Sequence, residues 1–431
     1  MTALLLIPFV LSACSGVQSG EQGPPETKQP EVKKPYTMFV FAQSVTEEEF
    51  NERFKTALER KFPHITFRYS AGGKGASITD LVAQGDIPDI IRTDVPTLQT
   101  GYLDLGLGQD LTSFVQTHKY DLNRFVPSFI QELTEAAPAG ELYGLPVPPY
   151  YPMVLYYNKD LFDKFGVTYP KDGMPWEDLV AKARQLSRTD GGVPYRGFSM
   201  NYLSVLRDNP FSLPILDPKA DQLSASDKWK TIFDHYLRLY ALPNNKIETV
   251  RANETNAFAK GNVAMQIDSY SIAAVNKAPK DANWDMAAYP LMEGAPKVTG
   301  QRGPAYWSLT KQSKHQDEAF QVIMQMLSDE IQMSDSMKGA PTTLVNPSIQ
   351  AALGKEHPVY RTKNMKAISY FPPASYAKKR DRGLKDVPLA TQQSLLGDAF
   401  LQTARGQVDV NTALRELGDK LKLELDKEKN K

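Results

Sequence analysis

The stretch from Tyr143 to Val167, YGLPVPPYYPMVLYYNKDLFDKFGV, combines three kinds of local pattern. Its first part is rich in proline, which fixes φ and has no N–H to donate. We therefore expect Leu145 to Pro152 to be a stiff extended crossing rather than a regular strand. Met153 to Tyr157 is a short apolar run typical of a buried strand, and a helix is expected from Asn158. The stretch predicts a loop that leads into a strand–helix unit.

The chain before this stretch alternates between strand and helix patterns. Buried strands are predicted at 36–42, 65–69 and 87–91, and a helix begins at Thr46, with Glu49 three residues later as in a capping box. This alternation is typical of a parallel sheet with crossover helices, in which ligands bind beyond the carboxyl ends of the strands. The positions that this rule singles out are Gln43, Ser44, Lys74 and Asp94.

Length and charge narrow the class of protein. A chain of 431 residues favours two domains. Lys and Arg together number 50, as do Asp and Glu, so the formal net charge is zero. This balance argues against nucleic acid as a partner, because nucleic acid favours a basic surface, and it fits a neutral ligand better than a polyion.

The single cysteine, Cys14, follows a short apolar run in the sequence Leu-Ser-Ala-Cys. This pattern is similar to the lipobox of bacterial lipoproteins, in which the cysteine is acylated and becomes the new N-terminus. The run is too short to span a bilayer, which favours a signal peptide. Residues 15–35 are poor in apolar side chains and rich in Pro, Gly, Glu and Lys, so we expect a disordered tether there.

Sequence motifs for catalysis are weak. There is no HExxH motif, no cysteine cluster and no G-x-S-x-G elbow, so no metal, cofactor or catalytic residue is predicted. Ser308–Lys311 and Ser375–Lys378 match S-x-x-K, but the S-D-N and K-T-G motifs that accompany it in penicillin-recognising enzymes are missing. The paired carboxylates of a glycosidase are a spatial feature, and the sequence leaves them open.

Several segments together resemble one family. GELYGLP at 140–146 and LYYNKDLF at 155–162 look like the signature of the family 1 extracellular solute-binding proteins, the ligand receptors of ABC importers, mostly for carbohydrates. FAKGNVAM at 258–265 and the segments 319–330 and 404–414 resemble later parts of the same family. The resemblance covers nearly the whole chain in the family's order.

The resemblance implies an α/β, two-lobed periplasmic-binding-protein-like fold, in which each lobe is a mainly parallel sheet flanked by helices. A hinge joins the lobes, and the ligand lies between them. The expected division is a signal peptide at 1–14, a tether at 15–35, a first lobe at 36–148 with 291–333, and a second lobe at 149–290 with 334–431.

Carried over segment by segment, the resemblance also implies ligand contacts. Aromatic rings beside polar side chains suit the apolar C–H faces and hydroxyl rims of sugars. One departure from the family is that Ser269 and Ser271 flank Tyr270, where the family usually has Gly and then an aromatic residue two positions on. The expected contacts are Gln43, Ser44, Asp94, Tyr150, Tyr151, Asp268, Tyr270, Tyr306 and Trp307.

The expected function is that of a monomeric, lipid-anchored receptor on the extracellular face of a Gram-positive plasma membrane. It would bind a sugar or oligosaccharide and deliver it to the transmembrane subunits of an ABC permease, without a cofactor and without catalysis. Two alternatives stay open: a surface lipoprotein that binds a protein partner, and a glycosidase or penicillin-recognising hydrolase.

The lipobox yields a direct test. Cys14→Ser removes the only thiol that can be acylated, so the protein should appear in the culture medium instead of the membrane fraction, as measured by immunoblot. Continued retention of the variant in the membrane fraction would contradict the lipobox interpretation.

Overall fold

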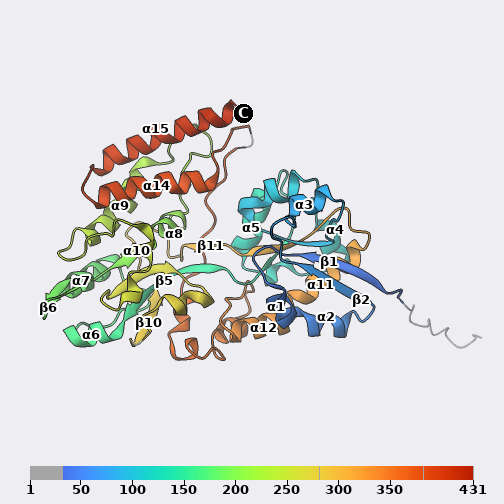
Figure 1. The fold of residues 1–431 in the computed structure, drawn as a ribbon, viewed down its shortest axis with the longest axis horizontal. Helices are drawn as coiled ribbons and strands as arrows, with labels where there is room; N and C mark the ends of the chain where they lie inside the picture. Colours follow the sequence, from blue (N-terminus) through green and yellow to red (C-terminus); the bar gives the residue numbers. More distant parts are fainter. Residues whose placement is uncertain (1–32, 281, 382, 431) are drawn as a thin grey trace, which may run out of the picture.

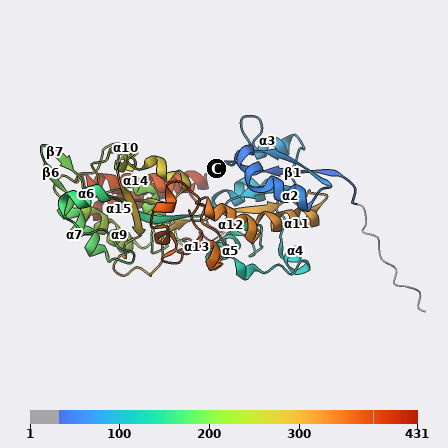
Figure 2. The same cartoon turned by 90° about the horizontal axis from the view of Figure 1, so that it is seen from below.

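The chain forms two α/β lobes that lie side by side and are joined at a waist (Figure 1). The view from below shows the same separation (Figure 2). This computed structural model describes residues 33–280, 282–381 and 383–430, so Cys14, the signal segment 1–14 and nearly all of the tether 15–35 lie outside the described residues.

The first lobe is built on a five-stranded sheet with the order β2-β1-β3-β12-β4. β1 is parallel to β2 and β3, whereas β12 is antiparallel to both β3 and β4. The central strands are apolar because helices cover the sheet, and Met38 to Phe41 are all buried. The strands are β1 (Tyr36–Phe41), β2 (Ile65–Ser70), β3 (Ile90–Thr93), β4 (Leu145–Val147) and β12 (Ala305–Leu309).

The first helix of this lobe begins as the sequence predicts. Thr46 caps it, since its hydroxyl accepts a hydrogen bond from Glu49 N at 3.1 Å. A π-helical segment, Asn51–Lys55, joins α1 to α2. The helices of the lobe are α1 (Glu47–Phe50), α2 (Thr56–Lys61), α3 (Ile78–Ala83), α4 (Thr112–Thr117), α5 (Pro127–Ala136), α11 (Gln316–Met326), α12 (Asp329–Met337) and α13 (Pro347–Ala351).

The second lobe is built on a sheet with the order β10-β5-β9-β8, and β11 pairs with the start of β5. Its strands are β5 (Tyr151–Asn158), β8 (Ser199–Met200), β9 (Met265–Ser269), β10 (Trp284–Ala288) and β11 (Gln301–Arg302), with a separate hairpin of β6 (Arg188–Asp190) and β7 (Val193–Tyr195). Its helices are α6 (Lys159–Phe165), α7 (Trp176–Leu186), α8 (Tyr202–Arg207), α9 (Ser226–Tyr240), α10 (Arg251–Thr255), α14 (Leu389–Ala404) and α15 (Val410–Lys429).

β5 serves two cores at once because successive side chains of a strand point to opposite faces. Met153, Leu155 and Tyr157 pack in the larger core, which includes side chains of α7, α9, α14 and α15. Val154 and Tyr156 pack on the other face, in a smaller core. The apolar run predicted from the sequence is thus a strand with both faces buried.

The two-lobed α/β fold is confirmed, and the sheets are mixed rather than mainly parallel. In the second lobe, β5 is antiparallel to both β9 and β10, and only β8 is parallel to its neighbour β9. The sequence pattern of the first three strands is local to the first lobe and does not extend to the rest of the chain.

The proline-rich stretch forms more sheet than the sequence predicts. Leu145–Val147 is a strand and β5 already begins at Tyr151, so the expectation of a non-strand crossing over 145–152 was wrong at both ends. β4 is the edge strand of its sheet and pairs only with β12. Pro146 is tolerated there because an edge strand has no partner on its other side to which a backbone N–H would have to donate. The crossing itself is confined to residues 148–150.

The chain changes lobes later than the expected boundaries at 291 and 334. Trp176 N donates to Leu291 O at 2.8 Å, and Leu291 N donates to Met174 O at 3.0 Å, which keeps this segment in the second lobe. The chain enters the first lobe only between β11 and β12. Leu344 and Ile349 pack in the first-lobe core, so the return follows α13.

Trp307 lies in the middle of the first-lobe core. Its indole is 1% exposed and meets the ring of Phe54 edge-on, with ring centroids 6.1 Å apart. β12, the strand that carries Trp307, lies between β3 and β4, and Trp307 is opposite Arg92 on β3 and Leu145 on β4.

Truncating this side chain should destabilise the lobe. Trp307→Ala is expected to lower the free energy of unfolding by about 3–5 kcal/mol, measured by urea denaturation, because it empties a packed core position. Tyr370→Ala is the control, since Tyr370 is 50% exposed and its loss should change little. A Trp307→Ala protein within about 1 kcal/mol of the wild type would contradict this placement.

Candidate functional site

Polar side chains from both lobes meet around the crossing that joins β4 to β5. We call this region the lobe junction; it comprises the ends of β1 and β3, the start of β5, β11, and the turn between β8 and α8. Gln43 and Ser44 follow β1, and both are exposed. Ser44 has φ 66°, a left-handed conformation that is uncommon outside glycine.

Asp94 follows β3 and already has a structural task. Its Oδ1 accepts a hydrogen bond from Thr97 N at 2.9 Å and so caps the short 3₁₀ turn Val95–Thr97. The Thr97 hydroxyl donates to the same oxygen at 2.5 Å. The carboxylate therefore holds the backbone at the edge of the junction.

Arg92 is a residue of this region that sequence reasoning did not select. It is half-buried, and its Nη1 donates to Gln43 O at 3.4 Å, a long hydrogen bond. Burial lowers the pKa of its guanidinium, while the neighbouring Tyr151 acts in the opposite direction. An arginine at the end of a buried strand is the signal that could have identified it.

The two tyrosines of the crossing lie differently. Tyr150 is buried, with its ring 5.0 Å from that of Phe129 on α5, and burial raises the pKa of its hydroxyl. Tyr151 is half-buried beside Arg92 and opens β5 opposite Arg302 of β11. Tyr151 is therefore the more accessible of the pair.

In the second lobe, Asp268 is the buried acid of β9. Its Oδ1 accepts hydrogen bonds from Asn201 Nδ2 at 3.1 Å and from Ser269 N at 2.7 Å. Arg207 and Asp208, at the end of α8, form an ion pair close enough to Asp268 to interact with it electrostatically. Sequence reasoning selected Asp268 but not Asn201 or Arg207. The strand before Asn201, β8, has only two residues, too few for a recognisable sequence pattern, and Arg207 ends the helix that follows.

Three of the nine expected contacts lie inside the packed cores rather than at the junction. Tyr270 donates its hydroxyl to Gly339 O at 2.7 Å, and Tyr306 donates to Phe129 O at 2.8 Å. Both rings and that of Trp307 are at most 1% exposed. The other six, namely Gln43, Ser44, Asp94, Tyr150, Tyr151 and Asp268, lie on segments at the junction or, for Asp268, on the strand paired with β5. A ligand contact by any of the nine stays a prediction.

Glu132 of α5 is a buried acid at the waist. Its side chain is 4% exposed, and within the described residues neither carboxylate oxygen has a hydrogen-bond partner of good geometry. Burial raises the pKa of this carboxyl well above its usual range, and Tyr306, Lys379 and Tyr376 only partly oppose the shift. The carboxyl also packs against the connection from β11 to β12, since a Cβ at Gly303 would lie 2.4 Å from Oε2.

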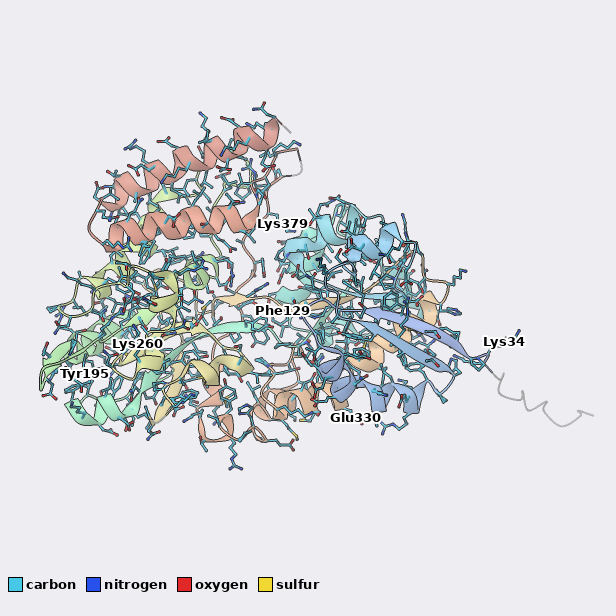
Figure 3. The ribbon with its side chains drawn as sticks, viewed as in Figure 1. Lys34, Phe129, Tyr195, Lys260, Glu330 and Lys379 are labelled. Atoms are coloured by element: carbon cyan, nitrogen blue, oxygen red, sulfur yellow. The ribbon has the colours of Figure 1, made fainter. Side chains whose placement is uncertain are left out.

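Lys379 approaches the same region from the second lobe. Its Nζ donates to Val95 O at 3.5 Å, and Figure 3 shows the residue at the waist, beside the first lobe. A segment of the second lobe thus reaches across to the end of β3.

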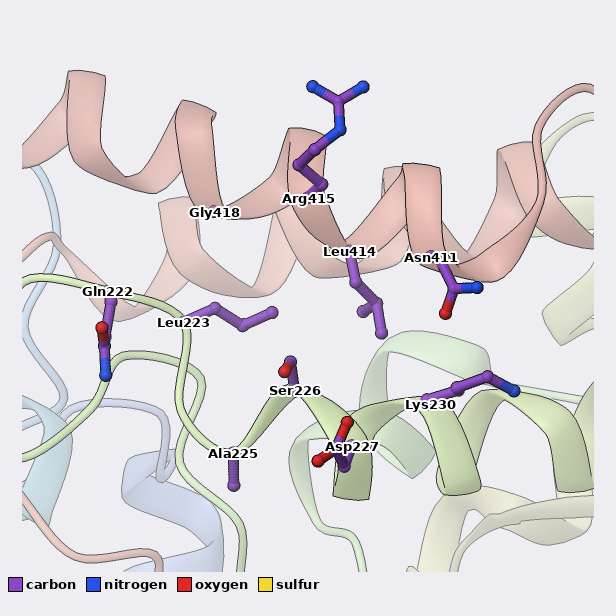
Figure 4. A pocket seen from close by; sticks show the side chains of 10 residues that line it. All are labelled: Gln222, Leu223, Ala225, Ser226, Asp227, Lys230, Asn411, Leu414, Arg415 and Gly418. Atoms are coloured by element: carbon purple, nitrogen blue, oxygen red, sulfur yellow. The ribbon is translucent and has the colours of Figure 1, made fainter.

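Two surface hollows lie away from the junction. Figure 4 shows the larger, about 580 Å³, between α9 and α15, lined by Lys230, Arg415 and neighbouring side chains. The other, about 510 Å³, lies between the first helices and β2, the edge strand of the first lobe. Neither contains any of the nine expected contacts.

Residues 33–280, 282–381 and 383–430 show neither a metal-binding cluster nor a membrane-spanning helix. They contain no group of three or more His, Cys, Asp or Glu side chains arranged to hold a metal ion. None of their helices combines the length and the hydropathy needed to cross a bilayer.

Comparison with known proteins points to one family. The model of the family described as "Bacterial extracellular solute-binding protein" matches residues 43–333. A binding protein of Brucella abortus (strain 2308) is 24% identical over 297 residues, which cover 63% of this chain and 67% of that protein.

Solved structures share the fold. A sugar transporter of Rhizobium etli in an open conformation superposes with a TM-score of 0.71 at 20% identity, covering 90% of this chain and 99% of that one. A periplasmic oligogalacturonide binding protein of Yersinia enterocolitica gives a TM-score of 0.65 at 18% identity, covering 91% and 99%.

The burial of Glu132 predicts that the free energy of unfolding decreases as the pH rises and the carboxyl loses its proton. Because its folded-state pKa lies above the ordinary value of 4.5, its contribution to stability is fully present below about pH 4.5 and is lost as the pH rises through the folded-state pKa. Glu132→Gln should therefore be more stable than the wild type at pH 8, by about 1–3 kcal/mol, with no gain at pH 4, in urea denaturation at both values. Glu135→Gln, at an exposed position of the same helix, should show no such pH-dependent gain. A Glu132→Gln effect equal at both pH values would contradict the assignment.

Proposed function

Because the chain belongs to the family of bacterial extracellular solute-binding proteins, we propose that it binds a sugar or oligosaccharide at the lobe junction and delivers it to the transmembrane subunits of an ABC permease. The observation that carries this proposal is the convergence of polar and aromatic side chains from both lobes on one crossing. Gln43 and Arg92 come from the first lobe, and Tyr151, Asn201 and Asp268 from the second.

The chemistry of these side chains suits a sugar. A half-buried tyrosine offers a flat face to the C–H groups of a pyranose, while amide and carboxylate groups accept and donate hydrogen bonds at its hydroxyls. Two of the solved structures that share this fold are those of a sugar transporter and an oligogalacturonide binding protein, and this favours a carbohydrate over other solutes as the ligand.

The arrangement of the lobes suits a receptor that closes on its ligand. Ligand held by side chains of both lobes stabilises the state in which those side chains are close together, and the surfaces so brought together form the face that a permease recognises. The protein acts as a monomer in this scheme and performs no catalysis.

Acylation at Cys14 and the tether that follows would hold the receptor at the extracellular face of the plasma membrane. A tether of about twenty residues reaches roughly 25 Å if it is flexible, which keeps the body close to a permease in the same membrane. A single acyl chain binds weakly, so the anchor would need a second chain or signal.

The test is thermal melting of the purified full chain in detergent against mono-, di- and oligosaccharides, with amino acids, polyamines and phosphate esters that contain no sugar as controls. A ligand at 100 times its Kd adds about 2.7 kcal/mol to stability, so the true substrate should raise Tm by up to a few degrees. A rise with a sugar class supports the proposal. A rise in Tm with a control class alone contradicts the proposal. The absence of a rise with every compound also contradicts it, and favours a protein partner.

A further inference from the structure

Arg92 is a half-buried cation that forms no ion pair with any described residue. No described carboxylate lies within 4.0 Å of its guanidinium, and its one hydrogen bond, to Gln43 O, is long at 3.4 Å. Removing a guanidinium from water costs free energy unless a charged partner replaces the water. Arg92 is therefore prepared for an acceptor that this chain does not provide.

A second cation lies next to Tyr151 on the neighbouring strand. Arg302 of β11 is the antiparallel partner of Tyr151 on β5, and side chains of directly paired residues project from the same face of a sheet. Arg302 is exposed, and no described carboxylate lies within 4.0 Å of it either. Tyr151 also interacts electrostatically with Arg92, so it has one neighbouring arginine from each lobe: Arg92 from β3 and Arg302 from β11.

The acids that interact electrostatically with these two arginines already have other hydrogen-bond or ion-pair partners. Asp94 caps the turn at Thr97, and Glu49 pairs with Arg53 at 3.2 Å. Asp208 interacts electrostatically with Arg302, but it is already hydrogen-bonded to Arg207, whose Nε lies 2.6 Å from Asp208 Oδ1. Each of these carboxylates already holds a backbone group or another cation.

We propose that the junction is selective for an acidic sugar, whose oxyanion pairs with Arg92 and Arg302 while its ring lies against Tyr151. This inference rests on the proposed function and names its substrate class. The planar guanidinium presents paired N–H donors that match a carboxylate or a phosphate in a bidentate geometry, so uronic acids and sugar phosphates share the required chemistry. A neutral sugar would leave both cations unpaired.

The experiment uses matched ligands and calorimetric titration of the full chain in detergent. The acidic ligands are glucuronate, galacturonate and mannuronate oligomers and hexose phosphates. The neutral ligands are the same oligomers after reduction of the carboxyl groups, and the parent hexoses. We expect one acidic ligand to bind at least tenfold more tightly than its neutral counterpart, and comparison of the uronate and phosphate arms identifies the oxyanion.

The variants connect the preference to the two arginines. Arg92→Gln and Arg302→Gln should each weaken binding of the acidic ligand at least tenfold and so remove most of its advantage over the neutral counterpart. Arg92→Lys keeps the charge but not the fork of donors, so its affinity should lie between those of Arg92→Gln and the wild type. Arg184→Gln, the same change at an exposed position on α7, is the control and should alter neither affinity.

The outcomes separate this inference from the proposed function. A neutral sugar that binds as tightly as its acidic counterpart, or an acidic preference that survives in both glutamine variants, overturns the inference and leaves the proposed function standing. Failure of every sugar, acidic or neutral, overturns both. Arg302 is exposed, so Arg302→Gln should fold normally and keeps the test decisive even if Arg92→Gln melts early.

Discussion

The structure depends on one constraint: the chain leaves the edge of one sheet at Val147 and enters the interior of another at Tyr151, with only three residues between. A buried ion pair fixes the first end of this crossing. Arg53 Nη2 donates to Pro148 O at 3.2 Å and to Asp335 Oδ2 at 2.8 Å, which connects the π-helical segment, the crossing and α12. Since both charged groups are largely shielded from water, losing either partner would leave an uncompensated charge at the waist.

This constraint explains why the polar side chains of the junction are where they are. Parallel strands bring their carboxyl ends to one edge of the first sheet, which places Gln43, Arg92 and Asp94 beside the crossing. The crossing delivers Tyr151 to the same place, and β9, paired with β5, adds Asp268. Residues far apart in the chain meet because this short connection holds the edges of the two sheets close together.

Local features of the fold could be predicted from the sequence. The apolar strands, the Thr46 cap and the helix after Asn158 depend on neighbouring residues, and periodicity and capping reveal them. Sheet order and the points at which the chain changes lobes depend on pairing between distant segments, such as β12 between β3 and β4. The sequence therefore predicted two lobes and the first crossing between them but placed the two later boundaries too early.

The candidate site was predicted less well, for a related reason. Strand-end positions such as Gln43 and Asp94 follow from a general rule of parallel sheets, whereas Arg92 and Asn201 matter through neighbours that only the fold supplies. Tyr306 and Trp307 show the converse case, because aromatic residues shortly after Gly303 and Pro304 resemble binding residues in sequence, and in the fold they lie in the core. Burial, which distinguishes the two cases, is a property of the folded chain.

The central claim is that a ligand held by both lobes brings them together. Small-angle X-ray scattering with and without a saturating sugar tests it most directly. The account predicts a smaller radius of gyration in the presence of the bound sugar, because side chains such as Arg92 and Asp268 would engage one ligand from opposite lobes. Identical scattering curves at saturation would contradict it.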